Sequence, residues 1–113
     1  MLKLKILIVD DENDYCIIMK NYFQAKDQEV FVASTLEECL DMLEKNHPDI
    51  LLLDNNLSDG KAWDHVNEIL AKLPSLKIYL ISAYKQKSDF VNPPPNVTVW
   101  EKPISLSILQ DII

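Results

Sequence analysis

Apolar residues gather into short runs along the chain, and the runs alternate with segments in which apolar residues recur every three or four positions. Unbroken apolar runs are typical of strands covered on both faces, whereas spacing at three and four is typical of helices with one buried face. The predicted strands are Leu4–Val9, Glu29–Ala33, Ile50–Asp54, Lys77–Ile81 and Val97–Trp100. Because strands and helical segments alternate, the pattern predicts an α/β fold whose parallel sheet carries helices on both faces.

The helical spacing predicts apolar helix faces within Tyr15–Phe23, Leu36–Leu43, Trp63–Leu73 and Leu106–Ile113. In the first, Ile18 and Met19 belong to the apolar positions, and Asn13 or Asp14 is placed to cap the helix. Thr35 with Glu38 matches the capping box of the second helix.

Two loops have informative compositions. Gly60 is the only glycine of the chain and follows Ile50–Asp54 closely, which predicts a positive φ angle there. Segment Lys85–Val91 is followed by Asn92 and three prolines. It has room for at most two helical turns, so we expect the helix before the last strand to be short or absent.

Composition limits the classes of function. The 113 residues fit one domain spanning residues 1–113, and 18 acidic residues against 11 basic ones give a formal net charge of −7. All the basic residues are Lys, and up to Asn56 there are 5 Lys against 12 acids. Since phosphate contact needs a cationic surface, we expect no direct nucleic-acid binding.

The two cysteines, Cys16 and Cys39, lie on the apolar sides of helical patterns, without the close spacing of a metal or redox pair. They are interpreted as small core residues. No stretch approaches the length of a membrane span, and the amino terminus lacks a long apolar run. These features predict a soluble, cytoplasmic protein with no membrane partner.

Polar side chains follow four of the predicted strands. Asp10 and Asp11 come after the first strand, Asp54 ends the third, Ser82 follows the fourth and Lys102 comes just after the fifth. Because the carboxyl ends of parallel strands share one edge of a sheet, we expect these side chains to lie together. Taken singly, each has a structural alternative: a solvated acidic turn, a strand end or a surface lysine.

Together, these residue types favour phosphoryl chemistry. Three carboxylates in one crevice repel each other unless a cation lies among them, and oxygen ligands with retained waters suit Mg2+. A hydroxyl and an ammonium can neutralise phosphoryl oxygens. A carboxylate can be the nucleophile, forming an acyl phosphate.

One set of residues resembles the signature of the receiver domain of two-component response regulators. The set consists of Asp10 and Asp11, Asp54 with Leu57 and Gly60, Ser82 with Ala83, and Lys102 with Pro103. The resemblance implies one flavodoxin-like, doubly wound sheet of five parallel strands in the order 2-1-3-4-5. It also implies a non-enzymatic signalling domain, whose phosphoacceptor Asp54 takes a phosphoryl group from a histidine kinase or a histidine phosphotransfer protein.

The same resemblance implies a role for each site residue. Asp11 is then the main Mg2+ ligand, and Asp10 assists it. Asp54 and the backbone carbonyl of Asn56 complete the set of ligands that the protein supplies. Ser82 is expected to hydrogen-bond the phosphoryl oxygens, and Lys102 to pair with them.

The sequence also departs from the family pattern. Ser58 replaces a usual proline, Ala62 a common glycine and Val99 the usual aromatic residue, with Trp100 one position late. These departures keep a second hypothesis open, a docking module of the same fold that acts without phosphorylation. A third is a Mg2+-dependent phosphatase with Asp54 as nucleophile, although Asn56 stands where such an enzyme needs a second acid.

Overall fold

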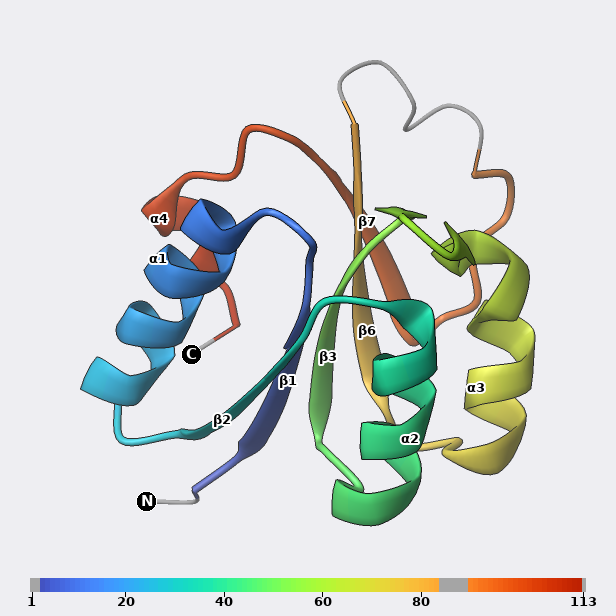
Figure 1. Ribbon diagram of the computed structural model, residues 1–113, viewed down its shortest axis with the longest axis horizontal. Helices are drawn as coiled ribbons and strands as arrows, with labels where there is room; N and C mark the ends of the chain where they lie inside the picture. The colour runs from blue at the N-terminus through green and yellow to red at the C-terminus, as the bar shows by residue number, and fades with distance from the viewer. Residues whose placement is uncertain (1–2, 84–89, 113) are drawn as a thin grey trace.

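The chain folds around a five-stranded parallel sheet with helices on both faces (Figure 1). A computed structural model describes residues 3–83 and 90–112. The elements, in chain order, are β1 (Lys5–Val9), α1 (Asn13–Ala25), β2 (Glu29–Ala33), α2 (Leu36–Asn46), β3 (Ile50–Asp54), β4 (Asn56–Leu57), β5 (Gly60–Lys61), the 3₁₀ helix η1 (Ala62–His65), α3 (Val66–Lys72), β6 (Lys77–Ser82), β7 (Val97–Glu101) and α4 (Leu106–Leu109).

The order of the main sheet is β2-β1-β3-β6-β7, with β4 and β5 forming a separate antiparallel pair. Counted over the five predicted strands, this is the order 2-1-3-4-5, so the predicted fold class is confirmed. The predicted shortening before the last strand concerns Lys85–Val91, of which residues 84–89 lie outside the described part of the chain. The described residues 90–96 contain no helix.

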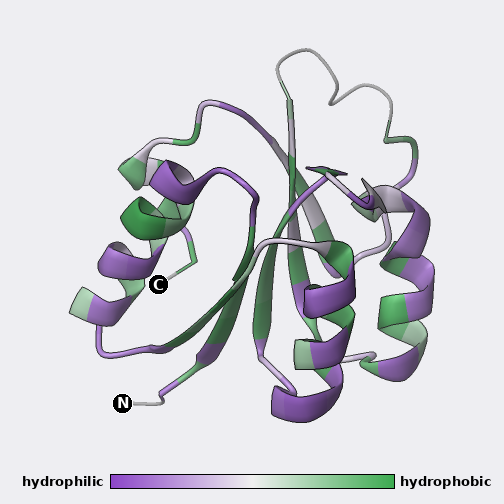
Figure 2. Ribbon diagram, in the orientation of Figure 1, coloured by the Kyte–Doolittle hydropathy of each residue, from purple (hydrophilic) through white to green (hydrophobic). Residues whose placement is uncertain are grey.

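Both faces of the sheet are covered by apolar packing, as the unbroken strand pattern predicts. Leu7 and Leu51 point to the α2 and α3 side, and Ile6 and Leu52 to the side of α1 and α4. Figure 2 shows hydrophobic strands between helices that carry both hydrophilic and hydrophobic residues. Each of these four side chains is at most 1% exposed, so each face of the sheet carries a buried apolar cluster.

Helix α1 differs from its prediction in two respects. Its N-cap is Glu12, without a side-chain cap bond, and Asn13 is already helical, so the predicted caps are wrong. Ile18 is 53% exposed, whereas Cys16 and Met19 are buried. The helix turns Cys16, Met19 and Phe23 inward, and this leaves Ile18 on the surface together with Ile17, which is 55% exposed.

The start of α2 is capped from two directions. The predicted Thr35 cap is confirmed, since its hydroxyl accepts a hydrogen bond from the Glu38 N–H at 3.1 Å. The carboxylate of Asp59, from the β4–β5 turn, accepts the N–H groups of Leu36 and Glu37 at 2.8 and 3.0 Å. This second cap ties the loop after β3 to α2.

The loop after β3 contains Gly60, for which a positive φ angle was predicted. Gly60 has a φ angle of 151°, and an added Cβ would lie 3.0 Å from Cδ1 of Leu36. A side chain is therefore disfavoured both by the backbone angle and by the neighbouring leucine.

The last two predicted helices lie where they were expected, but they differ from the prediction in helix type or length. The third helix begins as the 3₁₀ turn η1 before α3. The last helix, α4, has only four residues, and Ile113 lies outside the described residues. Among the described residues, no helix has both the length and the apolar character needed to cross a membrane.

Candidate phosphoryl and metal site

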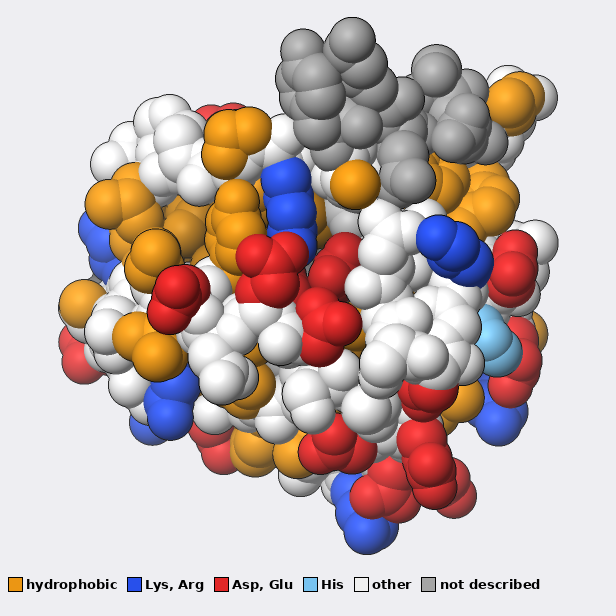
Figure 3. Space-filling view, turned by 45° about the horizontal axis from the view of Figure 1, so that its top comes forward, with side chains coloured by type: hydrophobic (Ala, Val, Ile, Leu, Met, Phe, Trp, Pro, Cys, Tyr) orange, Lys and Arg blue, Asp and Glu red, His pale blue; other side chains and the backbone are white. Residues whose placement is uncertain are grey.

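The register of the sheet brings the polar strand ends to one edge. Val9 pairs with Leu53 across β1 and β3, Asp54 with Ile81 across β3 and β6, and Ser82 with Glu101 across β6 and β7. The residues that follow therefore emerge side by side. Figure 3 shows acidic side chains gathered beside a basic one at this edge, with hydrophobic side chains bordering them on the side of α1.

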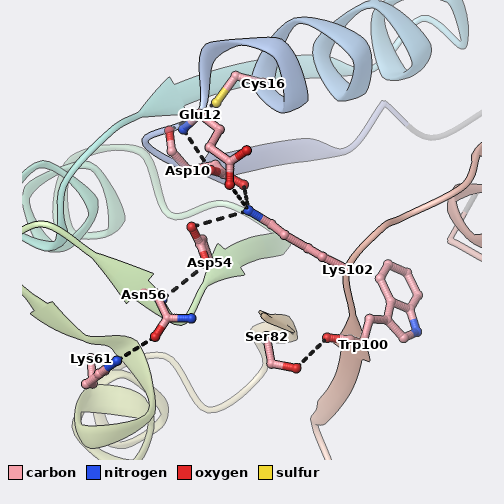
Figure 4. Close-up of polar contacts among 9 residues, drawn as sticks. All are labelled: Asp10, Glu12, Cys16, Asp54, Asn56, Lys61, Ser82, Trp100 and Lys102. Atoms are coloured by element: carbon pink, nitrogen blue, oxygen red, sulfur yellow. Dashed lines mark hydrogen bonds and ion pairs between the residues drawn. The ribbon is translucent and has the colours of Figure 1, made fainter. Parts of the chain in front are cut away.

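Lys102 lies at the centre of this group, as Figure 4 shows. Its Nζ lies 2.8 Å from Oε1 of Glu12, 3.2 Å from Oδ2 of Asp10 and 3.6 Å from Oδ2 of Asp54. The Lys102 side chain is only 14% exposed. Burial lowers the pKa of Lys102, but Glu12, Asp54 and Asp10 outweigh that effect and hold its pKa above the ordinary value. The ammonium is thus a fixed positive charge in the crevice.

Carboxylates that can hold a metal ion cluster at the end of β1. One oxygen from each of Asp10, Asp11 and Glu12 lies within 4.8 Å of the others. Oδ2 of Asp10 is buried and accepts no hydrogen bond from the described residues, although it forms an ion pair with Nζ of Lys102 at 3.2 Å. A buried carboxylate oxygen that accepts no hydrogen bond, in an all-oxygen donor set, fits a hard cation such as Mg2+.

Asp54 is a buried carboxylate whose charge is unfavourable. It is 3% exposed, and desolvation raises its pKa from 3.8 to about 6. A backbone hydrogen bond from Asn56 N–H to Oδ1 and the charge of Lys102 oppose the rise, whereas the charges of Asp10 and Asp11 add to it. Asp54 is therefore ionised mainly above pH 6.

Ser82 and Asn56 lie at the same edge, but their side chains have other partners. The buried Ser82 hydroxyl donates to the Trp100 carbonyl at 3.2 Å. Oδ1 of Asn56 accepts a hydrogen bond from Nζ of Lys61 at 2.6 Å. The predicted roles of Ser82 and of the Asn56 carbonyl remain predictions.

Neighbouring groups hold the site residues in place. Asn55 is buried, donates its N–H to the Ile81 carbonyl at 2.8 Å and accepts the N–H of Trp63 at its side chain. The thiol of Cys16 donates to the Asp10 carbonyl, and burial raises its pKa to about 11. Cys16 is thus a packing residue, as predicted.

Two contacts to Lys102 were not anticipated from the sequence. Glu12 was visible as the third acid after the first strand, and Tyr15 only as an apolar helix position. Both lie within reach of Nζ: the ring centroid of Tyr15 is 4.5 Å away. Glu12 and Lys102 are 90 positions apart in sequence, so no local pattern indicated their contact.

Comparison with known proteins assigns this arrangement to a family. Residues 6–93 match the family described as response regulator receiver domain. The chain is 33% identical over 92 residues to chemotaxis protein CheY of Listeria monocytogenes, covering 79% of this chain and 76% of that protein. It is 23% identical over 116 residues to sporulation initiation phosphotransferase F of Bacillus subtilis, covering 100% of this chain and 93% of that protein.

A solved structure shares the fold. The CheY-like response regulator receiver domain protein of Methanospirillum hungatei JF-1 superposes with a TM-score of 0.87 at 23% identity. The match covers 98% of this chain and 91% of that one.

Proposed function

This chain belongs to the response regulator receiver domain family, and from that premise we propose that Asp54 is its phosphoacceptor. Receiver domains are signalling domains, and phosphorylation on an aspartate is the general function of the family. One observation carries the choice of Asp54. It is the buried carboxylate at the end of the central strand β3, with Lys102 Nζ 3.6 Å from one oxygen and the acidic cluster beside it.

The proposed reaction is a transfer of a phosphoryl group to the Asp54 carboxylate. The attacking oxygen forms a bond to phosphorus while the bond from phosphorus to the donor breaks, and the donor leaves with that electron pair. The product is an aspartyl phosphate. Lys102 compensates the negative charge, and the Ser82 hydroxyl exchanges the Trp100 carbonyl for a phosphoryl oxygen. In this proposal the domain catalyses only its own phosphorylation and dephosphorylation.

Receiver domains bind Mg2+ at an acidic pocket, and the residues here fit that ion. We assign its ligands to Asp10, Asp11, Asp54 and the backbone carbonyl of Asn56. When bound, Mg2+ supplies positive charge that neutralises the crevice and the phosphoryl oxygens. Oδ2 of Asp10, which is buried and accepts no hydrogen bond from the described residues, supports this assignment.

The proposed phosphoryl donor is a histidine kinase or a histidine phosphotransfer protein in the cytoplasm, with residues 1–113 acting as one receiver domain. The name of the relative sporulation initiation phosphotransferase F supports a place in phosphoryl transfer. The alternative of a docking module that acts without phosphorylation is not favoured, because the family match and the assembled acids and lysine agree with the phosphoacceptor function.

Intact-mass measurement after incubation with acetyl phosphate and Mg2+ tests the proposal. We expect wild type to gain one phosphoryl group, and Asp54→Ala and samples containing EDTA to gain none. The proposal fails if wild type gains nothing, or if Asp54→Ala gains the same group.

A further inference from the structure

Glu12 has no assigned part in the phosphoryl chemistry, yet it makes the shortest of the three carboxylate contacts to Lys102. Its Oε1 accepts a hydrogen bond from Nζ at 2.8 Å, compared with 3.2 Å for Asp10 and 3.6 Å for Asp54. The ring of Tyr15 lies 4.5 Å from the same nitrogen. Since Glu12 is the N-cap of α1 and Tyr15 lies in its first turn, the start of this helix holds the ammonium.

Lys102 and a divalent cation need the same carboxylates. Asp10 and Asp54 are the other two anions around Nζ, and both are assigned to the metal. Figure 4 shows Glu12 and Asp10 on one side of the amino group and Asp54 on the other. Because like charges repel strongly in a half-buried site, an ammonium lying fully on Asp10 and Asp54 disfavours cation binding there.

We propose that Glu12 is a positioning residue, whose carboxylate gives the Lys102 ammonium a partner other than Asp10 and Asp54 and so frees those two carboxylates for the cation. The inference rests on the proposed phosphoryl site. Glu12 suits the task because its side chain is 57% exposed and can follow the amino group outward, unlike Asp10, which is 1% exposed. Without Glu12, the ammonium, which already lies 3.2 Å from Asp10 and 3.6 Å from Asp54, loses the carboxylate that draws it away from them.

A rival explanation is that Glu12 is itself a metal ligand, because its carboxylate lies in the cluster with Asp10 and Asp11. The two explanations differ in whether Glu12 needs Lys102. A positioning role disappears when the lysine is removed, whereas direct ligation or simple charge attraction persists. A double-mutant cycle separates them.

The experiment measures Mg2+ affinity from backbone amide chemical shifts in wild type, Glu12→Gln, Lys102→Met and the double variant. We expect Glu12→Gln to weaken Mg2+ binding by about threefold to tenfold, because it removes a charged hydrogen bond to a largely buried lysine. Lys102→Met is expected to bind Mg2+ more tightly than wild type. Adding Glu12→Gln to Lys102→Met is expected to change the affinity less than about twofold.

Asp14→Asn is the matched control, since it removes an exposed carboxylate from the first turn of the same helix. We expect it to change Mg2+ affinity less than about twofold. Equal weakening by Glu12→Gln with and without Lys102 overturns the positioning role, as does an effect no larger than that of Asp14→Asn. If wild type shows no Mg2+ response, the proposed phosphoryl site fails together with the role of Glu12. If wild type responds to Mg2+ but Glu12→Gln has no larger effect than Asp14→Asn, only the role of Glu12 fails.

Discussion

Asp54 and Lys102 show how single residues prepare the site. Burial disfavours the Asp54 charge, which raises its pKa to about 6, while Asp10 and Asp11 add repulsion. Lys102 and the Asn56 N–H provide only partial compensation. The carboxylate is therefore largely ionised at neutral pH, and the folded state is destabilised by its charge.

This balance predicts a pH-dependent gain of stability for Asp54→Asn. The folded-state pKa of about 6 exceeds the ordinary 3.8, so the stabilising effect of the protonated group is fully present below pH 3.8 and is lost as pH rises through 6. At pH 7.5 in EDTA, we expect Asp54→Asn to be more stable than wild type by roughly 1–3 kcal/mol. Near pH 4, the difference should vanish.

Urea denaturation at the two pH values measures this difference. Asp64→Asn serves as control, because Asp64 is an exposed carboxylate and its replacement should change stability by less than about 0.5 kcal/mol. An Asp54→Asn variant that is no more stable at pH 7.5, or equally stabilised at pH 4, contradicts the account of Asp54.

Among the elements, α2 shows how the loop after β3 is anchored. Thr35 caps the helix from within, and Asp59 caps it from the β4–β5 turn. Those two backbone hydrogen bonds lower the pKa of Asp59. Gly60, next to Asp59, packs against Leu36 of α2. The helix start therefore helps to fix the loop that carries Asn56.

Replacing Thr35 should destabilise the fold at this point. Thr35→Ala removes the acceptor for the Glu38 N–H and should lower the free energy of unfolding by ~1 kcal/mol. Ser34→Ala is the matched control, since the Ser34 hydroxyl donates to the exposed Glu38 carboxylate and should matter by less than about 0.5 kcal/mol. Urea denaturation compares them, and equal losses would show that the Thr35 cap contributes nothing specific.

The strands and the helix order could be predicted because buried runs and helical spacing are local patterns. Two other contacts could not be predicted from the sequence, because they join residues distant in the chain. They are the cap of α2 by Asp59 and the hydrogen bond between Asn55 and Ile81. The exposure of Ile18 was missed because several apolar faces are compatible with the sequence of α1. In each case the tertiary partner decided the outcome.

For the molecule as a whole, parallel strand order explains why the site could be anticipated. The carboxyl ends of β1, β3, β6 and β7 lie on one edge, so the sequence sufficed to group Asp10, Asp54 and Lys102. The sequence did not indicate that Glu12 is nearest to Lys102, nor that the Ser82 hydroxyl bonds the Trp100 carbonyl. Those contacts depend on side-chain directions at the edge.

Locating the phosphoryl group after reaction with acetyl phosphate and Mg2+ tests directly whether Asp54 is the phosphoacceptor. Borohydride reduction of the acyl phosphate, followed by peptide mass analysis, marks the modified carboxylate. We predict a single reduced position at Asp54. Modification at Asp10 or Asp11 instead, or a phosphoryl group that resists reduction and lies on Ser82, would contradict the account.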